Sequence, residues 1–76
     1  MTVYEIKGTV LTLEKGNELG AKHGIVFSED NHIYLNREMI GMYVLDEKKK
    51  KIKITLLEKD PKVVGLLYQL DPKVQL

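Results

Sequence analysis

The 76-residue chain contains no cysteine and no tryptophan, and it has only one phenylalanine and two prolines. Without cysteine it can form no disulfide, no thiolate zinc site and no cysteine nucleophile. Its longest apolar stretch, residues 63–68, falls far short of the roughly 20 residues that a membrane-spanning helix needs. An acidic residue, Glu5, precedes any apolar run, which is unlike a secretory signal peptide. We therefore expect a cytoplasmic protein that contacts no membrane.

What is present is typical of one globular domain. Hydrophobic residues make up 43% of the chain and charged residues 30%. We expect a single domain over residues 1–76, with residues 71–76 as a flexible tail. The net charge is only +1, although four consecutive lysines stand at 48–51. Nucleic-acid binders usually carry a larger basic excess, so any affinity for phosphate must come from the local placement of cations.

The dominant hydrophobic period is two, which indicates β-strands. Ile52, Ile54 and Leu56 alternate with polar residues, and a second alternating set follows the turn signal Asp60-Pro61. The second set lies within residues 63–70 and predicts a further strand. The polar residues 58–62 before it predict the hairpin loop that leads into this strand. The pattern predicts five strands, at residues 3–13, 23–28, 32–36, 49–57 and 63–70.

Helical signals are few. Asn36 is a candidate N-cap for a single turn over residues 37–40, which Gly41 would end. Small strand-rich chains avoid exposed sheet edges by closing into a barrel. We therefore expect an all-β fold, a five-stranded barrel with one short helical turn.

Three segments resemble motifs of the cold-shock domain. Residues 8–13, Gly-Thr-Val-Leu-Thr-Leu, stand where that family has G-x-V-K-W-F. Lys22-His23-Gly24-Ile25-Val26 is similar to its first RNP motif, and residues 32–40 are similar to its second. The resemblance spans about residues 6–68 and implies an OB-type barrel that binds single-stranded RNA or DNA. Thr12 replaces the family's surface tryptophan, so fewer rings remain for base stacking, which is worth about 1–3 kcal/mol per base.

Strand alternation and this resemblance together predict a binding face. If Val26 points into the barrel, then His23, Ile25 and Phe27 share the opposite face, and Tyr34 lies beside them on the next strand. In the inverted assignment, Ile25 and Phe27 belong to the core. The expected nucleic-acid site consists of eight residues: Lys7, Lys22, His23, Ile25, Phe27, Tyr34, Asn36 and Arg37. The same face could instead bind a protein partner or a second copy of the chain.

Other chemistry has little support in the sequence. The two imidazoles, His23 and His32, would need turn carboxylates to complete a zinc site. Ser28 is the only serine, and the spacing of Gly16 and Gly20 does not match a phosphate-binding loop. We expect no catalytic residue, no metal and no cofactor. The lysine run 48–51 is either a set of phosphate contacts or a solvated strand end.

Overall fold

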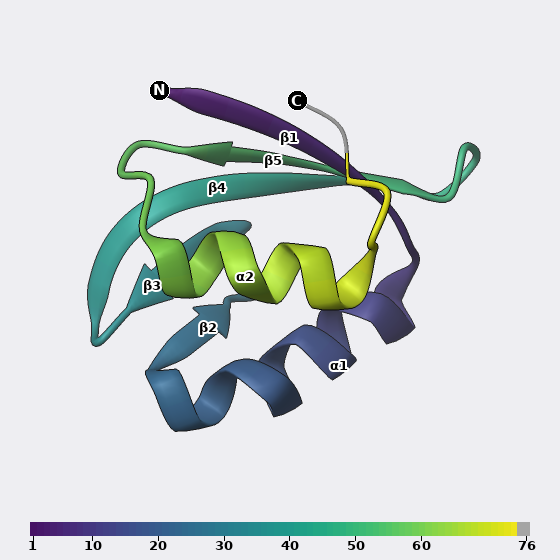
Figure 1. Cartoon of the computed structure of the whole chain (residues 1–76). Coiled ribbons are helices and arrows are strands. Elements are labelled where there is room, and N and C mark those ends of the chain that lie inside the picture. Colours follow the sequence, from purple (N-terminus) through teal and green to yellow (C-terminus); the bar gives the residue numbers. More distant parts are fainter. Residues whose placement is uncertain (75–76) are drawn as a thin grey trace.

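The computed structural model describes residues 1–74, which form five strands, two α-helices and one short 3₁₀ helix (Figure 1). β1 (Thr2–Lys7) is followed by α1 (Val10–Gly20), the 3₁₀ helix η1 (Ala21–His23) and β2 (Ile25–Phe27). The chain then runs through β3 (His32–Leu35), β4 (Glu38–Asp46) and β5 (Lys51–Leu56) to α2 (Pro61–Leu70). The fold is therefore mostly β, with a helix after the first strand and another after the last.

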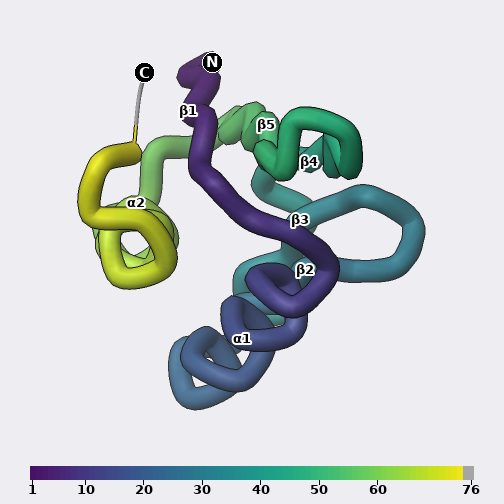
Figure 2. The backbone as a smooth tube through the Cα atoms, turned by 90° about the vertical axis from the view of Figure 1, so that its right-hand side faces the viewer, coloured from purple at the N-terminus to yellow at the C-terminus, as the bar shows by residue number. Residues whose placement is uncertain are grey.

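All five strands belong to one antiparallel sheet, in the order β1-β5-β4-β3-β2. Within the described residues β1 and β2 are the two edges of this sheet, so the pairings do not close it into a barrel. The sheet curves around α2, and α1 packs against both α2 and β2 (Figures 1 and 2). The helices thus cover the concave face and leave the opposite face bare.

A β-bulge in β4 produces much of this curvature. Ile33 pairs with Gly41 and Tyr34 with Met39, so that Ile40 is the extra residue on the β4 side. Both Ile40 and Gly41 are buried, which interrupts the two-residue alternation of the strand. A bulge bends its strand and increases the local twist. β4 accordingly pairs with β5 in its second half and turns away to follow β3 in its first half (Figure 1).

The expected strand over residues 3–13 is correct only as far as Lys7. Thr9 begins a helix, because its hydroxyl accepts a hydrogen bond from the Leu11 N–H at 3.2 Å. Its own N–H donates to the Thr12 hydroxyl at 3.0 Å, which completes a capping box. Thr12, which aligns with a strand tryptophan in the cold-shock resemblance, is therefore a helical capping residue.

The expected strand over residues 63–70 is wrong, because this segment is the helix α2. Asp60 caps it by accepting the Lys62 N–H at 2.8 Å, and Pro61 occupies the first turn, where its missing N–H costs nothing. The buried residues Val63, Leu66 and Leu67 lie on one helical face. The Asp60-Pro61 pair is thus a helix start and not the tip of a hairpin.

The helical turn expected over residues 37–40 is also wrong. Asn36 and Arg37 both have positive φ, 51° and 70°, and form the tight turn between β3 and β4. Such values suit a two-residue hairpin turn, whose twist matches that of the strands it joins. The segment after this turn is the longest strand of the sheet, β4, which the sequence reading did not predict.

The core lies between the concave face of the sheet and the helices. Ile33, Ile52 and Ile54 are fully buried, as the alternation of β3 and β5 predicts. Gly20 of α1 allows close packing, since a Cβ there would lie 2.9 Å from the Ile25 Cβ. The buried apolar residues are Tyr4, Ile6, Ile25, Phe27, Ile33, Ile40, Tyr43, Ile52, Ile54, Leu56, Val63, Leu66 and Leu67.

The C-terminal segment is described as far as Val74. Asp71 accepts a hydrogen bond from the Lys7 N–H at 2.8 Å, and Val74 packs against the core. This part of the expected flexible tail is therefore attached to β1, while residues 75–76 lie outside the described residues.

Candidate binding face

The assignment of Ile25 and Phe27 to an exposed stacking face is wrong. Their exposed fractions are 0% and 5%, whereas Val26 between them is 47% exposed. Phe27 packs edge-to-face against Tyr43, with ring centroids 5.8 Å apart. β2 is so short that its own pattern allows either orientation, and the helix packed against it makes Ile25 and Phe27 the inner pair. The predicted stacking face therefore loses two of its apolar members.

Tyr34 does point outward, as the alternation of β3 predicts. Its hydroxyl donates a hydrogen bond to an Asp30 carboxylate oxygen at 3.2 Å, and its ring lies edge-to-face on His32. The Asp30 carboxylate also lies 3.2 Å from Nδ1 of His32. The hydrogen bond with His32 lowers the pKa of Asp30, and donation to this carboxylate raises the pKa of the Tyr34 phenol. Asp30 thus fixes both outward rings of β3.

Asn36 and Arg37 lie next to Tyr34, as predicted, and border an open hollow. The hollow has a volume of about 510 Å³ and a mostly apolar lining. The Asn36 N–H donates to the Gly24 carbonyl at 2.9 Å, and a Cβ at Gly24 would overlap the Asn36 side chain. This contact holds the turn that carries Arg37. The lining residues are Gly24, Val26, Ser28, Tyr34, Asn36 and Arg37.

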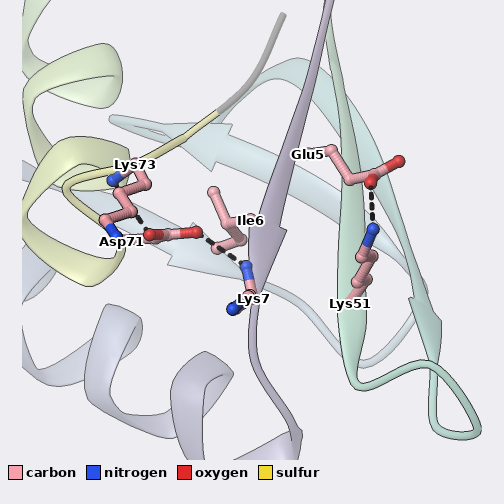
Figure 3. A pocket seen from close by; sticks show the side chains of 6 residues that line it. All are labelled: Glu5, Ile6, Lys7, Lys51, Asp71 and Lys73. Atoms are coloured by element: carbon pink, nitrogen blue, oxygen red, sulfur yellow. Dashed lines mark hydrogen bonds and ion pairs between the residues drawn. The ribbon is translucent and has the colours of Figure 1, made fainter.

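The other predicted site residues lie elsewhere. Lys7 is at the end of β1, and its N–H is bound by Asp71 in a separate hollow that Lys73 also lines (Figure 3). Lys22 and His23 belong to η1, where His23 borders a small cleft against α2. The structure therefore brings together only Tyr34, Asn36 and Arg37 of the eight predicted residues.

The bare face of the sheet, which we call the outer face, carries a row of exposed apolar side chains. Val26, Tyr34 and Met39 are neighbours across β2, β3 and β4. In a second row, His32, Met42, Thr55 and Val3 are neighbours across β3, β4, β5 and β1. Of the ten exposed large hydrophobic residues among residues 1–74, five lie on this face: Val3, Val26, Met39, Met42 and Val44, with exposed fractions between 39% and 58%.

Sequence reasoning missed Met39, Met42 and Val44, because it did not predict β4. A signal existed in the segment Met39-Ile40-Gly41-Met42-Tyr43-Val44-Leu45, whose composition favours a strand. The alternation breaks at Ile40-Gly41, where the structure has its bulge. A glycine within a strand pattern is a typical mark of such a bulge.

Cations border the apolar rows at the β4–β5 end. The four-lysine run begins in the hairpin loop, where the Asp46 carboxylate accepts the N–H groups of Lys48 and Lys49, each at 3.1 Å. The outer face has its second hollow at this end, with a volume of about 210 Å³. Lys51 in this hollow is paired with Glu5 at 3.0 Å, on the side of β1 away from Asp71 (Figure 3). The hollow is lined by Glu5, Val44, Asp46, Lys49, Lys51 and Lys53.

The described residues offer no metal-binding cluster. No group of three or more histidine, cysteine, aspartate or glutamate side chains is placed to hold a metal ion within residues 1–74. The two histidines belong to different elements, η1 and β3. The Ser28 carbonyl accepts a hydrogen bond from the Tyr43 hydroxyl. Neither helix of the described part is long and apolar enough to span a membrane.

The comparisons with known proteins add no relative. No protein family, no curated protein and no solved structure matches this chain.

Proposed function

We propose that this protein is a non-catalytic binding module whose outer sheet face docks a protein partner. The observation that carries the proposal is the concentration on one face of half of the exposed large hydrophobic residues within residues 1–74, over three of the five strands. Contiguous exposed apolar surface of this kind marks interaction sites in soluble proteins. Methionine, tyrosine and arginine are also enriched in protein interfaces, and this face holds all three.

The arrangement of polar groups supports a protein partner further. Met39 and Met42 lie on β4, the central strand of the sheet, whereas Arg37 lies in the turn before β4 and Lys53 borders the hollow near the β4–β5 loop. An apolar centre with a polar rim is the usual anatomy of a protein–protein interface. Because α1 and α2 lie against the opposite face, a partner can reach the outer face without displacing either helix.

Single-stranded RNA or DNA is the second candidate, and one observation favours it. The outward Tyr34 ring lies on the same face as Lys49, Lys51 and Lys53, so a stacking ring and phosphate-binding cations share one surface. Ile25 and Phe27 contribute nothing to it, because they are buried. The OB-type barrel that the cold-shock resemblance implies remains a prediction, as does a cytoplasmic location, and neither is needed for binding through the outer face.

The test compares the wild-type chain with a triple variant, Val26→Thr, Met39→Gln and Met42→Gln. These changes keep side-chain size and replace apolar groups with polar ones at exposed positions, so the fold should be retained. We expect proteins captured from an extract by the immobilised wild-type chain to be lost with the triple variant. The matched control is Leu11→Gln. Leu11 is also apolar and is 73% exposed, but it lies on α1 and not on the outer face, so this change should leave capture unchanged.

A titration with labelled single-stranded oligonucleotides at low and moderate salt separates the two candidates. Oligonucleotide binding that weakens with salt and is lost in Tyr34→Ala would contradict the protein-partner proposal. Capture that is identical for the wild type, the triple variant and Leu11→Gln would contradict it as well, because it would show that the outer face is not used.

A further inference from the structure

We propose that the outer face binds a peptide segment of the partner that carries carboxylates on both sides of an apolar centre. This inference rests on the proposed function and specifies the chemistry of the ligand. It is carried by the distribution of charge and by two hollows, one at each end of the apolar rows. The first hollow is bordered by Arg37 and the second by Lys49 and Lys53.

Three carboxylates near this face have donors from the chain itself. Glu5 is paired with Lys51, Asp30 accepts hydrogen bonds from Tyr34 and the His32 N–H, and Asp46 accepts two backbone N–H groups. By contrast, within residues 1–74 no ion pair involves Arg37, Lys49 or Lys53. At both ends of the face, therefore, there are cations without an ion pair in the described part of the chain, while Glu5, Asp30 and Asp46 have partners within the chain. Complementary charge at such a rim directs association and fixes the register of the bound chain.

The apolar centre determines what lies between the carboxylates. Val26 and Tyr34 form the mostly apolar wall of the first hollow, and Met39 is their neighbour across the sheet. Met42 and Val44 continue the exposed apolar surface toward the second hollow. Exposed methionine side chains adapt their shape, so they suit an apolar group of the ligand without requiring one particular residue.

The length of β4 sets the spacing. Arg37 directly precedes β4 and Lys53 pairs with Val44, seven residues further along, which corresponds to roughly 23 Å at about 3.3 Å per residue before the shortening at the bulge. A ligand that reaches both cationic ends therefore needs acidic groups about this far apart. The outer face is the convex face of the curved sheet, so two copies would touch over only a small area, whereas a narrow peptide can lie along it.

The test is selection of binders from a displayed library of random short peptides on the immobilised full chain. We expect the recovered peptides to be enriched in aspartate or glutamate on both sides of leucine, isoleucine or aromatic residues. Binding of one such synthetic peptide should weaken by about 3- to 10-fold in Arg37→Glu and in Lys53→Glu, since each change replaces an attraction by a repulsion. It should also weaken at higher salt, because exposed ion pairs are screened.

Lys62→Glu is the matched control, since Lys62 is an exposed lysine of α2 on the other side of the sheet. This change should alter peptide binding by less than about twofold. Equal weakening in Lys62→Glu would show that only the overall charge matters, and it would overturn the inference.

Four further outcomes separate failure of the inference from failure of the proposed function. Peptides that require Met42 but show no acidic enrichment would overturn the inference and leave the proposed function intact. A library that yields no binder dependent on Met42 would contradict both. Sedimentation showing a dimer that Met42→Gln dissociates, or oligonucleotide binding that Lys53→Glu abolishes, would assign the face to a second copy or to nucleic acid and would overturn the inference.

Discussion

Asn17 is the side chain that covers the free edge of β2. Its Oδ1 accepts the Phe27 N–H at 2.7 Å, and its Nδ2 donates to the Phe27 carbonyl at 3.2 Å. An uncovered edge strand offers such groups to strands of other molecules. One amide side chain of α1 therefore satisfies both backbone groups of Phe27 that point away from β3, and it fixes α1 against the sheet.

We expect Asn17→Ala to lower the free energy of unfolding by about 1–3 kcal/mol, because it leaves a half-buried N–H and carbonyl without their partner. Urea denaturation measures the change, with an unchanged m value showing that the compactness of both states is preserved. The control Glu18→Ala, at an exposed position of the same helix, should stay within about 0.5 kcal/mol of the wild type. Equal midpoints for both variants would show that the Asn17 bonds do not stabilise the fold.

Asp71 makes stability depend on pH. Its carboxylate accepts the N–H groups of Lys7 at 2.8 Å and of Lys73 at 3.0 Å (Figure 3), and the bond from Lys7 is the largest cause that lowers its pKa below the ordinary 3.8. A carboxyl with a lower pKa in the folded state holds fewer protons there than in the unfolded chain. Its stabilisation is complete above the ordinary pKa and is lost as pH falls through the lowered one.

We therefore expect the free energy of unfolding to fall as pH is lowered below about 5, and to fall less steeply in Asp71→Asn. Asp30 has a lowered pKa too, so part of the slope should remain in this variant and should decrease further when Asp30→Asn is added. Urea denaturation at a series of pH values measures both slopes. An identical pH profile for the wild type and Asp71→Asn would contradict the role given to this carboxylate.

The glycine in α2 and the glycine next to the bulge in β4 differ in how much space a side chain would have. Gly65 lies within α2. Apart from its two chain neighbours and the nearby helix backbone, no atom of residues 1–74 lies within 4 Å of the position that a Cβ would occupy. Gly41 follows the bulge residue, and a Cβ there would overlap the Thr55 carbonyl oxygen. The first glycine only weakens its helix, whereas the second is required by the close approach of two strands.

We expect Gly65→Ala to stabilise the protein by about 0.5–1 kcal/mol, since alanine has the higher helix propensity and nothing obstructs it. Gly41→Ala should destabilise it by about 1–3 kcal/mol, because the backbone of β5 must shift. Thermal melting followed by circular dichroism gives both signs. A lower melting temperature for Gly65→Ala would contradict the helical assignment of residues 61–70.

The whole molecule depends on one core between the curved sheet and α2. Ile33 and Ile54 are fully buried in it, on strands that β4 separates. We expect Ile33→Ala and Ile54→Ala each to cost about 2–5 kcal/mol, which is a large part of the stability of so small a domain. Lys53→Ala, beside Ile54 but exposed, is the control and should have little effect. Denaturation midpoints close to that of the wild type for both isoleucine variants would contradict this core.

Much of β3 and β5 could be predicted from the sequence. In β5, Ile52, Ile54 and Leu56 are buried and alternate with Lys51, Lys53 and Thr55, as expected. In β3, Ile33 is inward and Tyr34 outward, again as expected. Local patterning was sufficient there, because a strand that covers a core on one face must alternate. This pattern correctly predicted that Tyr34 points outward, and the role of Tyr34, Asn36 and Arg37 in binding stays a prediction.

The helix α2 shows why other elements could not be predicted. Val64, Leu66, Tyr68 and Leu70 fit a period of two, while Val63, Leu66, Leu67 and Leu70 fit a helical period equally well. The concave side of the sheet offers space for one apolar helix, and α2 buries Val63, Leu66 and Leu67 against it. The choice between strand and helix was made by this packing.

Composition and local period are sufficient to specify an apolar core, the lack of thiols and the alternation of the two clearest strands. The orientation of β2 is not specified in this way, because its three residues fit either face until α1 packs against them. The tertiary structure also creates the outer face, because the bulge at Ile40 and the pairing of β2, β3 and β4 bring Val26, Met39 and Met42 together. Residues distant in sequence become one surface only when the strands that carry them are hydrogen-bonded side by side.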